Sequence, residues 1–210
     1  MRIARTGAAL MLVGVLALAA CSTADDAAAP STPRATSASE DPTGPAAPLT
    51  PLADAPAGWS RIELGAVTLD VPDGFAVVQE PAATDAPDGS WIVRYGDQDG
   101  ERAAITVVRD PAPTRAPADT AAAALSAARA QHSVQDDASA GLAWPGAEAA
   151  TYLTYLQGVR VGGTAVEHRA EWVYADLADG SQVVVGVFAP LDLFDELQMH
   201  DVLATWRPAG

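Results

Sequence analysis

Few side chains in this chain have the type and spacing needed for chemistry. Its one cysteine, Cys21, lies near the start, and its three histidines, His132, His168 and His200, are far apart. No two of the histidines have the His-x-x-x-His or His-Glu-x-x-His spacing of a helical zinc site. No Gly-x-Ser-x-Gly turn is present to hold a serine nucleophile. The sequence therefore predicts no catalytic residue, no metal site and no cofactor.

The alternating carboxylates of Asp97-Gln98-Asp99-Gly100-Glu101 come nearest to a metal motif. A calcium loop of this type needs a third ligand before the glycine and a glutamate further on, and neither is present. We interpret the segment as a hairpin turn. An acid and a base brought together only by the fold are the one enzymatic alternative that the sequence leaves open.

A secretory leader precedes Cys21. Arg2 and Arg5 give it a basic start, and residues 7–20 are uncharged and mostly apolar. As a helix, this run measures roughly 21 Å at about 1.5 Å per residue, too short for a hydrocarbon core of about 30 Å. The layout is typical of a signal peptide rather than of a membrane span.

The end of the leader, Leu18-Ala19-Ala20-Cys21, resembles the lipobox of bacterial lipoproteins. The resemblance implies that residues 1–20 are a lipoprotein signal peptide, that cleavage precedes Cys21, and that the sulfur carries diacylglycerol. Several long acyl chains, at about 0.8 kcal/mol per buried methylene, hold a protein firmly. The implied location is the extracytoplasmic face of the cell membrane. An ordinary signal peptide with an incidental cysteine is the alternative.

The charge balance limits the possible partners. The formal net charge of the chain is −15, and without Arg2 and Arg5 it becomes −17. Such an acidic chain is not expected to bind nucleic acid or anionic lipid headgroups through a basic patch. The expected attachment to the membrane is therefore the lipid on Cys21.

Residues 21–56 are predicted to comprise the lipidated cysteine and a disordered linker. Ala, Pro, Ser, Thr and Asp dominate them, and Trp59 is the first aromatic residue of the chain. This composition buries too little apolar surface to offset the entropy lost on ordering. A flexible coil of this length reaches roughly 33 Å. The alternative is that the tail folds onto the domain, above all at Leu49 to Leu52.

All aromatic residues lie between Trp59 and Trp206, which places one folded domain at residues 57–208. Alternating apolar and polar residues predict its strands, and short turns make the hairpin neighbours antiparallel. The predicted strands are 67–71, 75–78, 91–95, 104–108, 147–159, 164–177 and 182–189.

Two helices complete the domain. The first is predicted at 118–131, with Asp119 as its candidate cap and a face of small residues against the sheet. The second begins at Asp192 and ends near Trp206. Residues 132–146 are interpreted as a loop. The predicted fold class is α+β, an antiparallel sheet of about six strands flanked by helices.

Two stretches carry a resemblance to a known family. Leu69-Asp70-Val71-Pro72-Asp73-Gly74-Phe75 opens the domain, and Leu203-Ala204-Thr205-Trp206 closes it. With the element order between them, they resemble the Mog1/PsbP-like domains of bacterial lipoproteins, including the LpqN-type lipoproteins of mycobacteria. The resemblance covers residues 60–208 and implies an α/β/α sandwich. The family lacks a shared active site, and its members bind proteins or small ligands in the envelope.

Aromatic side chains are the candidate ligand-binding residues, namely Trp91, Tyr152, Tyr155 and Trp172. They could line an apolar or sugar-binding cleft, or they could simply fill the core. Tyr152 and Tyr155 point to opposite faces of one predicted strand, so we expect at least one of them to be exposed.

The preferred hypothesis is a lipid-anchored, non-catalytic envelope lipoprotein that binds an envelope protein partner. A carrier or sensor of a small apolar or glycolipid ligand is the alternative. An enzyme with a carboxylate pair is the weakest of the three hypotheses.

Overall fold

A computed structural model of the chain describes residues 49–79, 90–95, 103–161 and 163–209. These residues all belong to one unit, Gly44–Gly210. Cys21, the linker up to residue 48 and the Asp97–Glu101 segment lie outside the described residues. No helix among those described is long and apolar enough to cross a membrane.

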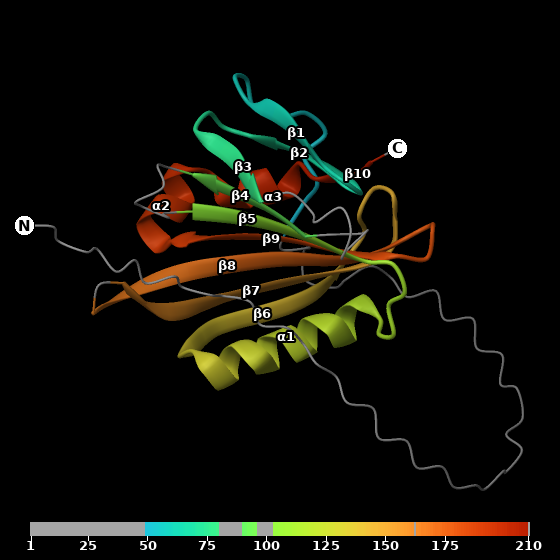
Figure 1. Ribbon diagram of the computed structural model, residues 1–210. Helices are drawn as coiled ribbons and strands as arrows, with labels where there is room; N and C mark the ends of the chain where they lie inside the picture. Colours follow the sequence, from blue (N-terminus) through green and yellow to red (C-terminus); the bar gives the residue numbers. More distant parts are fainter. Residues whose placement is uncertain (1–48, 80–89, 96–102, 162, 210) are drawn as a thin grey trace, which may run out of the picture. The chain divides into compact units, whose positions relative to one another are not determined.

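The main sheet has seven antiparallel strands in the order β3-β4-β5-β9-β8-β7-β6 (Figure 1). The strands are β3 Phe75–Gln79, β4 Ser90–Tyr95, β5 Ala103–Asp110, β6 Val134–Leu142, β7 Ala147–Val161, β8 Thr164–Leu177 and β9 Gln182–Pro190. A smaller sheet has the order β1-β2-β10, from β1 Ser60–Leu64, β2 Val67–Val71 and β10 Arg207–Pro208.

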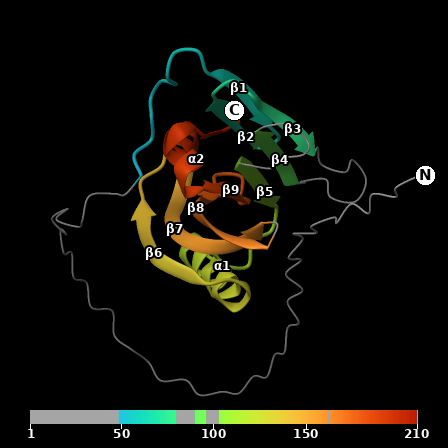
Figure 2. The same ribbon diagram turned by 90° about the vertical axis from the view of Figure 1, so that its left-hand side faces the viewer.

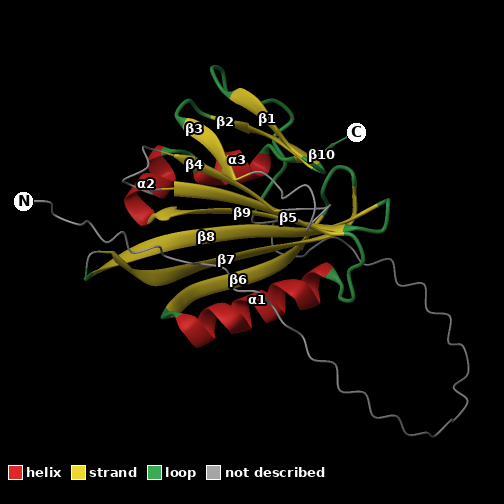
Figure 3. Cartoon of the chain, viewed as in Figure 1, coloured by secondary structure: helices red, strands yellow, loops and turns green. Residues whose placement is uncertain are grey.

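Helices lie on both faces of the main sheet (Figures 2 and 3). Helix α1, Pro117–Gln131, covers one face at β6, β7 and β8, whereas α2, Leu191–Glu196, and α3, Met199–Ala204, lie on the other. The predicted α+β class, an antiparallel sheet flanked by helices, is therefore confirmed.

The sheet separates two hydrophobic cores because successive strand residues point to opposite faces. In β8, Val173 and Ala175 face the larger core, while Ala170 and Tyr174 face α1. The larger core includes Leu64, Leu69, Val93, Ile105, Val185, Phe194, Leu203 and Trp206. The smaller core holds Ala121 of α1 with Leu153 and Tyr155 of β7, and Ala124, Leu125 and Ala128 pack against it, as the predicted face of the helix requires.

Residues 132–146 were predicted as a loop, but they contain β6. The sequence Val-Gln-Asp-Asp-Ala-Ser-Ala-Gly-Leu lacks alternation because β6 is an edge strand with mostly exposed side chains. A bulge between Gln135 and Ala138 further shifts its register. Strands β1 and β10 were likewise not predicted.

The final helix is two short helices rather than one. Gln198 separates α2 from α3 with a left-handed φ of 52°, which ends one helix before the next begins. Neither predicted cap is a cap, because the cap positions are Ala116 and Pro190, neither with a side-chain hydrogen bond. Asp119 and Asp192 instead lie in the first helical turns, where a negative charge suits the helix dipole.

The folded part begins earlier than residue 57. Leu49 is only 1% exposed and belongs to the larger core. The Leu52 N–H donates to the Ala204 carbonyl oxygen over 2.9 Å. Leu49 to Leu52 thus pack on the domain, as the alternative that the sequence left open has it, and residues 21–48 lie outside the described residues.

Candidate functional site

The candidate ligand-binding aromatics do not form one site. Tyr152 and Tyr155 are 3% and 7% exposed, on opposite faces of β7, so the expectation that one would be exposed is wrong. Tyr155 and Trp172 lie on the α1 face, and Tyr152 lies on the other. Trp91 belongs to β4, and its side chain lies outside the described part of the chain.

Tyr152 instead adjoins a polar cluster that the sequence did not predict. Thr154 of β7 lies opposite Glu171 of β8 in the sheet register, two residues from Tyr152 and on the same face. Glu171 is 4% exposed although it is acidic. Its Oε2 lies 2.7 Å from Nδ1 of His200, which α3 brings over the sheet. We name Tyr152, Thr154, Arg169, Glu171 and His200 the Glu171 cluster.

A carboxylate accepts hydrogen bonds, and in this contact the Nδ1–H of His200 is assigned as the donor to Oε2 of Glu171. This bond raises the pKa of His200 above its ordinary value, against the opposing effect of burial; Asp201 adds to the rise and Arg169 opposes it. Burial, followed by the charge of Glu171, raises the pKa of Tyr152, which therefore stays neutral.

Arg169 joins the cluster to α2. It precedes Glu171 by two residues in β8 and therefore lies on the same face. Its guanidinium lies 5.4 Å from the ring centroid of Phe194, and its Nη1 lies 3.8 Å from Oδ1 of Asp195. Both charged pairs of the cluster thus connect β8 to the two short helices.

The chemistry available to the cluster is limited by these pairings. A carboxylate on Nδ1 orients an imidazole as in acid–base dyads. Here, however, the same bond fixes α3 against the sheet, and Arg169 is likewise paired with a neighbouring helix. Within the described ranges, no group of three or more His, Cys, Asp or Glu side chains could hold a metal ion. The arrangement suits a structural link between elements.

A row of rings occupies the opposite face of β8 and β9. His168 stacks on Phe188 with centroids 4.7 Å apart and planes at 12°. Next to them the indole of Trp172 lies over Gly186, where a Cβ atom would collide with the ring. Burial lowers the pKa of His168, which favours its neutral form in the stack. Trp172 and Phe188 are partly exposed, so this row is where a planar ligand would meet aromatic surface.

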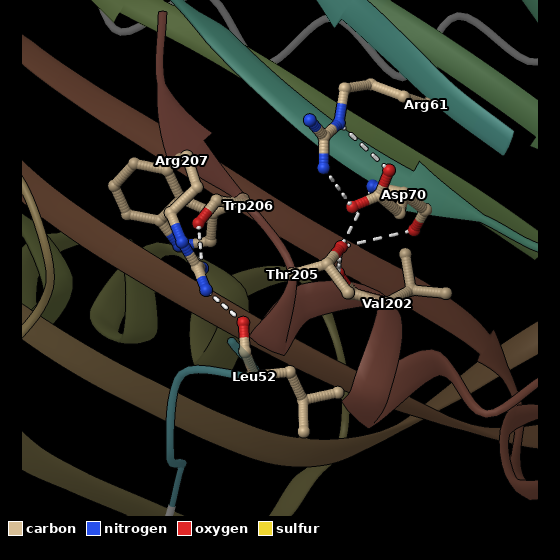
Figure 4. A network of polar contacts seen from close by, with 7 residues as sticks. All are labelled: Leu52, Arg61, Asp70, Val202, Thr205, Trp206 and Arg207. Atoms are coloured by element: carbon tan, nitrogen blue, oxygen red, sulfur yellow. Dashed lines mark hydrogen bonds and ion pairs between the residues drawn. The ribbon is translucent and has the colours of Figure 1, made fainter. Parts of the chain in front are cut away.

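A second polar network joins the two stretches that carry the family resemblance (Figure 4). The Thr205 hydroxyl accepts from the Asp70 N–H over 2.9 Å and donates to the Val202 carbonyl oxygen over 2.8 Å. Arg61 pairs with both carboxylate oxygens of Asp70 at 3.0 Å. The Arg207 guanidinium donates to the Leu52 carbonyl oxygen. This network holds β2, α3 and the first described segment together.

Neither network has a local signal in the amino-acid sequence. Glu171 and His200 are separated by a turn, a strand and a helix, and Asp70 lies 135 residues from Thr205. Glu171 could have been recognised only as an acidic residue on a buried face of its strand. Which face of β8 is buried is known only once the register of β8 in the sheet is known.

Comparisons with known proteins give distant likenesses. No protein-family profile matches the sequence, and no curated protein matches it either. Among solved structures, PA94 of Pseudomonas aeruginosa, a protein of unknown function, is 18% identical, with a TM-score of 0.44 over 72% of this chain and 98% of that chain. LpqN of Mycobacterium tuberculosis, involved in cell envelope biogenesis, is 14% identical, with a TM-score of 0.41 over 71% and 91% of the two chains. At these scores the likenesses carry no conclusion about function.

Proposed function

We propose that this chain is a lipid-anchored lipoprotein of the cell envelope, a non-catalytic LpqN-like module that binds another envelope protein. The observation that carries the proposal is the leader ending in Leu18-Ala19-Ala20-Cys21. It would place the acidic domain on the extracytoplasmic face of the membrane, held by lipid on a single sulfur.

The contacts of the domain support the non-catalytic part of the proposal. The acid and base groups that come together, Glu171 with His200 and Asp70 with Arg61, hold elements to one another. His200 contributes its Nδ1 to a contact that joins α3 to β8 and gives the buried carboxylate of Glu171 a hydrogen-bond partner.

The anchor is tested by Cys21→Ser in cells of the native host. The natural protein is expected in the membrane fraction, labelled by a palmitate analogue. The variant should lose the label and leave the membrane. A control, Ser22→Ala, should behave as the natural protein does. Retention of the serine variant in the membrane would contradict the anchor.

The binding of a protein partner is tested by crosslinking in intact cells, followed by mass spectrometry. One envelope protein should be recovered repeatedly with the natural protein. It should not be recovered with the Cys21→Ser variant, which is released from the envelope surface. Failure to recover any reproducible protein would contradict this part of the proposal.

A second candidate function is a carrier or sensor of a small apolar ligand. The rings of His168, Trp172 and Phe188, which we name the aromatic row, favour it. Its supporting observation is that Trp172 and Phe188 stay partly exposed beside one another. Ligand stacked there would quench Trp172 fluorescence, and Trp172→Phe should remove the quenching. Organic extracts of the purified envelope protein that contain no bound small molecule would contradict this function.

A further inference from the structure

The outer edge of β6 is open. β6 is the last strand on its side of the main sheet, and no strand in the described ranges pairs with it from outside. Every second residue of such a strand directs its N–H and C=O away from the sheet. An edge of this kind is a template for another strand unless charges, proline or a bulge protect it.

The first half of β6 is protected. The register shifts between Gln135 and Ala138, where Asp136 has a left-handed φ of 51°. Asp137 accepts from Arg129 of α1 over 2.7 Å, and Gln135 donates to Glu167 of β8 over 2.6 Å. The bulge and its charges prevent regular pairing along this part of the edge.

The second half of β6, Ala138 to Leu142, has none of these features. It keeps a regular register with β7 and carries no charge. Its residues are Ala, Ser, Ala, Gly and Leu, so small side chains leave the backbone accessible. Gly141 is exposed, and because it has no side chain this surface is backbone. A Cβ atom built on Gly141 would meet nothing within 4 Å.

The other edges in the described part of the chain differ. β1 carries Arg61 and Glu63 along its five residues, and charges on an edge oppose pairing. β10 has only two residues. β3 ends where the described residues end. Compared with β1 and β10, the stretch Ala138–Leu142, which we name the β6 edge, has the features that favour pairing with a further strand.

We propose that the β6 edge is the docking site for the envelope partner, which contributes an extended segment of neutral or basic sequence as an eighth strand. This rests on the proposed function and names its surface. Backbone hydrogen bonds would supply the affinity, and Leu142, which packs against the larger core, would contact an apolar side chain of the partner. The chain is formally −15, and Asp136 lies at one end of the edge, whereas Asp137 is paired with Arg129. This charge disfavours a second copy of this chain and favours a partner without acidic residues.

The test places a photoreactive benzoyl-phenylalanine at Ser139 or at Gly141 of the full-length protein in its native cells. The same probe at Ser126 on α1 and at Ala178 in the β8–β9 turn provides exposed controls. Strand pairing predicts that both edge probes label one segment of one protein. Moving the probe by two residues should move the labelled residue by about two.

The outcomes separate the proposals. Labelling of a protein from the controls but not from the edge would overturn docking at β6 and leave the proposed function standing. Labelling of a second copy of this chain from the edge would overturn the assignment of the partner. Absence of any labelled protein at all four positions would overturn both proposals.

Ser139→Pro and Ala140→Pro give a matched pair of blocking variants. Of two adjacent residues in an edge strand, one directs its N–H to β7 and the other directs its N–H outward. The proline variant at the residue with the outward N–H should keep the melting temperature of the natural protein, because no hydrogen bond to β7 is lost. It should reduce labelling from position 141 by about tenfold or more. Unchanged labelling in the folded variant would overturn the proposal. If both variants unfold, the probes at Ser139 and Gly141 of the natural protein provide the test: labelled partner residues that do not shift by about two would overturn the proposal.

Discussion

A buried carboxylate in the middle of a strand is costly unless it is paired. Glu171 has such a partner in His200, whose side chain is 42% exposed and is therefore reached by solvent protons. The charged groups that influence His200 are Glu171, Asp201 and Arg169, and the acidic pair outweighs the arginine. The docking of α3 on β8 should therefore depend on pH.

The sign follows from the raised pKa of His200. The folded chain holds the proton more tightly than the unfolded chain, in which a histidine titrates near pH 6.5. The stabilisation is therefore complete below about pH 6.5 and is lost as the pH rises through the raised pKa. Its size should be about 1 kcal/mol or less, because solvent screens a half-exposed pair.

His200→Gln keeps a hydrogen-bond donor but cannot be charged. We expect the variant to have a lower free energy of unfolding than the natural protein at pH 6. This difference in free energy of unfolding should become smaller by pH 9. Urea unfolding at the two pH values measures this difference. Gln131→Ala, at the end of α1, removes no titratable group and is the control, so its effect on the free energy of unfolding should be the same at both pH values. If the difference in free energy of unfolding between His200→Gln and the natural protein were the same at both pH values, the stabilisation by a charged His200 beside Glu171 would be contradicted.

The aromatic row depends on a glycine. Gly186→Ala would push a Cβ atom into the ring of Trp172, so strand or indole must move. We expect a loss of roughly 1–3 kcal/mol in unfolding free energy, with an altered near-ultraviolet dichroism spectrum. Gly141→Ala, where the added carbon meets open space, should change stability by about 0.5 kcal/mol or less. Equal effects at the two glycines would show that the indole does not lie on β9.

At the scale of elements, prediction succeeded where periodicity was strong. The strands expected at 164–177 and 182–189 agree with β8 and β9 within a residue. β8 alternates apolar and polar residues over much of its length, and β9 is a short apolar run that is buried on both faces. β6 was missed because an edge strand has little to bury. The Glu171 cluster was missed for a different reason, since it depends on how α3 is placed on the sheet.

The break between α2 and α3 was also invisible in the sequence. Gln198 has no intrinsic preference for the left-handed region, which costs a non-glycine residue roughly 1–2 kcal/mol. The residues around it, Leu197 and Met199, are buried, and their burial offsets the strain. The buried positions of the two helices, rather than their local propensity, therefore determine where the chain turns.

Gln198→Gly should relieve this strain. We expect the free energy of unfolding to rise by about 1 kcal/mol, since glycine adopts a positive φ without steric cost. Ala122→Gly, on the exposed side of α1, should instead lower the free energy of unfolding by about 0.5–1 kcal/mol. Thermal and urea unfolding measure both. A destabilised Gln198→Gly would show that one continuous helix, as the sequence predicted, forms in solution.

At the scale of the whole domain, the first and the last described segments are held by hydrogen bonds to one another and to the elements beside them. Leu52 bonds to Ala204 and Arg207, and the Ala209 N–H donates to the Ala66 carbonyl oxygen over 2.7 Å. Trp206, two residues after the end of α3, stacks on Trp144 with ring centroids 5.1 Å apart. Leu49 to Leu52 and β10 thus close the same side of the larger core.

The first described segment is therefore expected to be part of the cooperative fold. A chain that begins at residue 57 lacks Leu49, whose side chain is almost fully buried, and the backbone bond of Leu52 to Ala204. Compared with a chain that begins at residue 44, it should lose at least the roughly 2–5 kcal/mol of a buried leucine. Leu49→Ala in the longer chain should reproduce much of this loss, whereas Thr50→Ala, at an exposed neighbour, should cost about 0.5 kcal/mol or less. Equal unfolding midpoints for the two chains would show that the residues before 57 do not contribute to the stability of the folded domain.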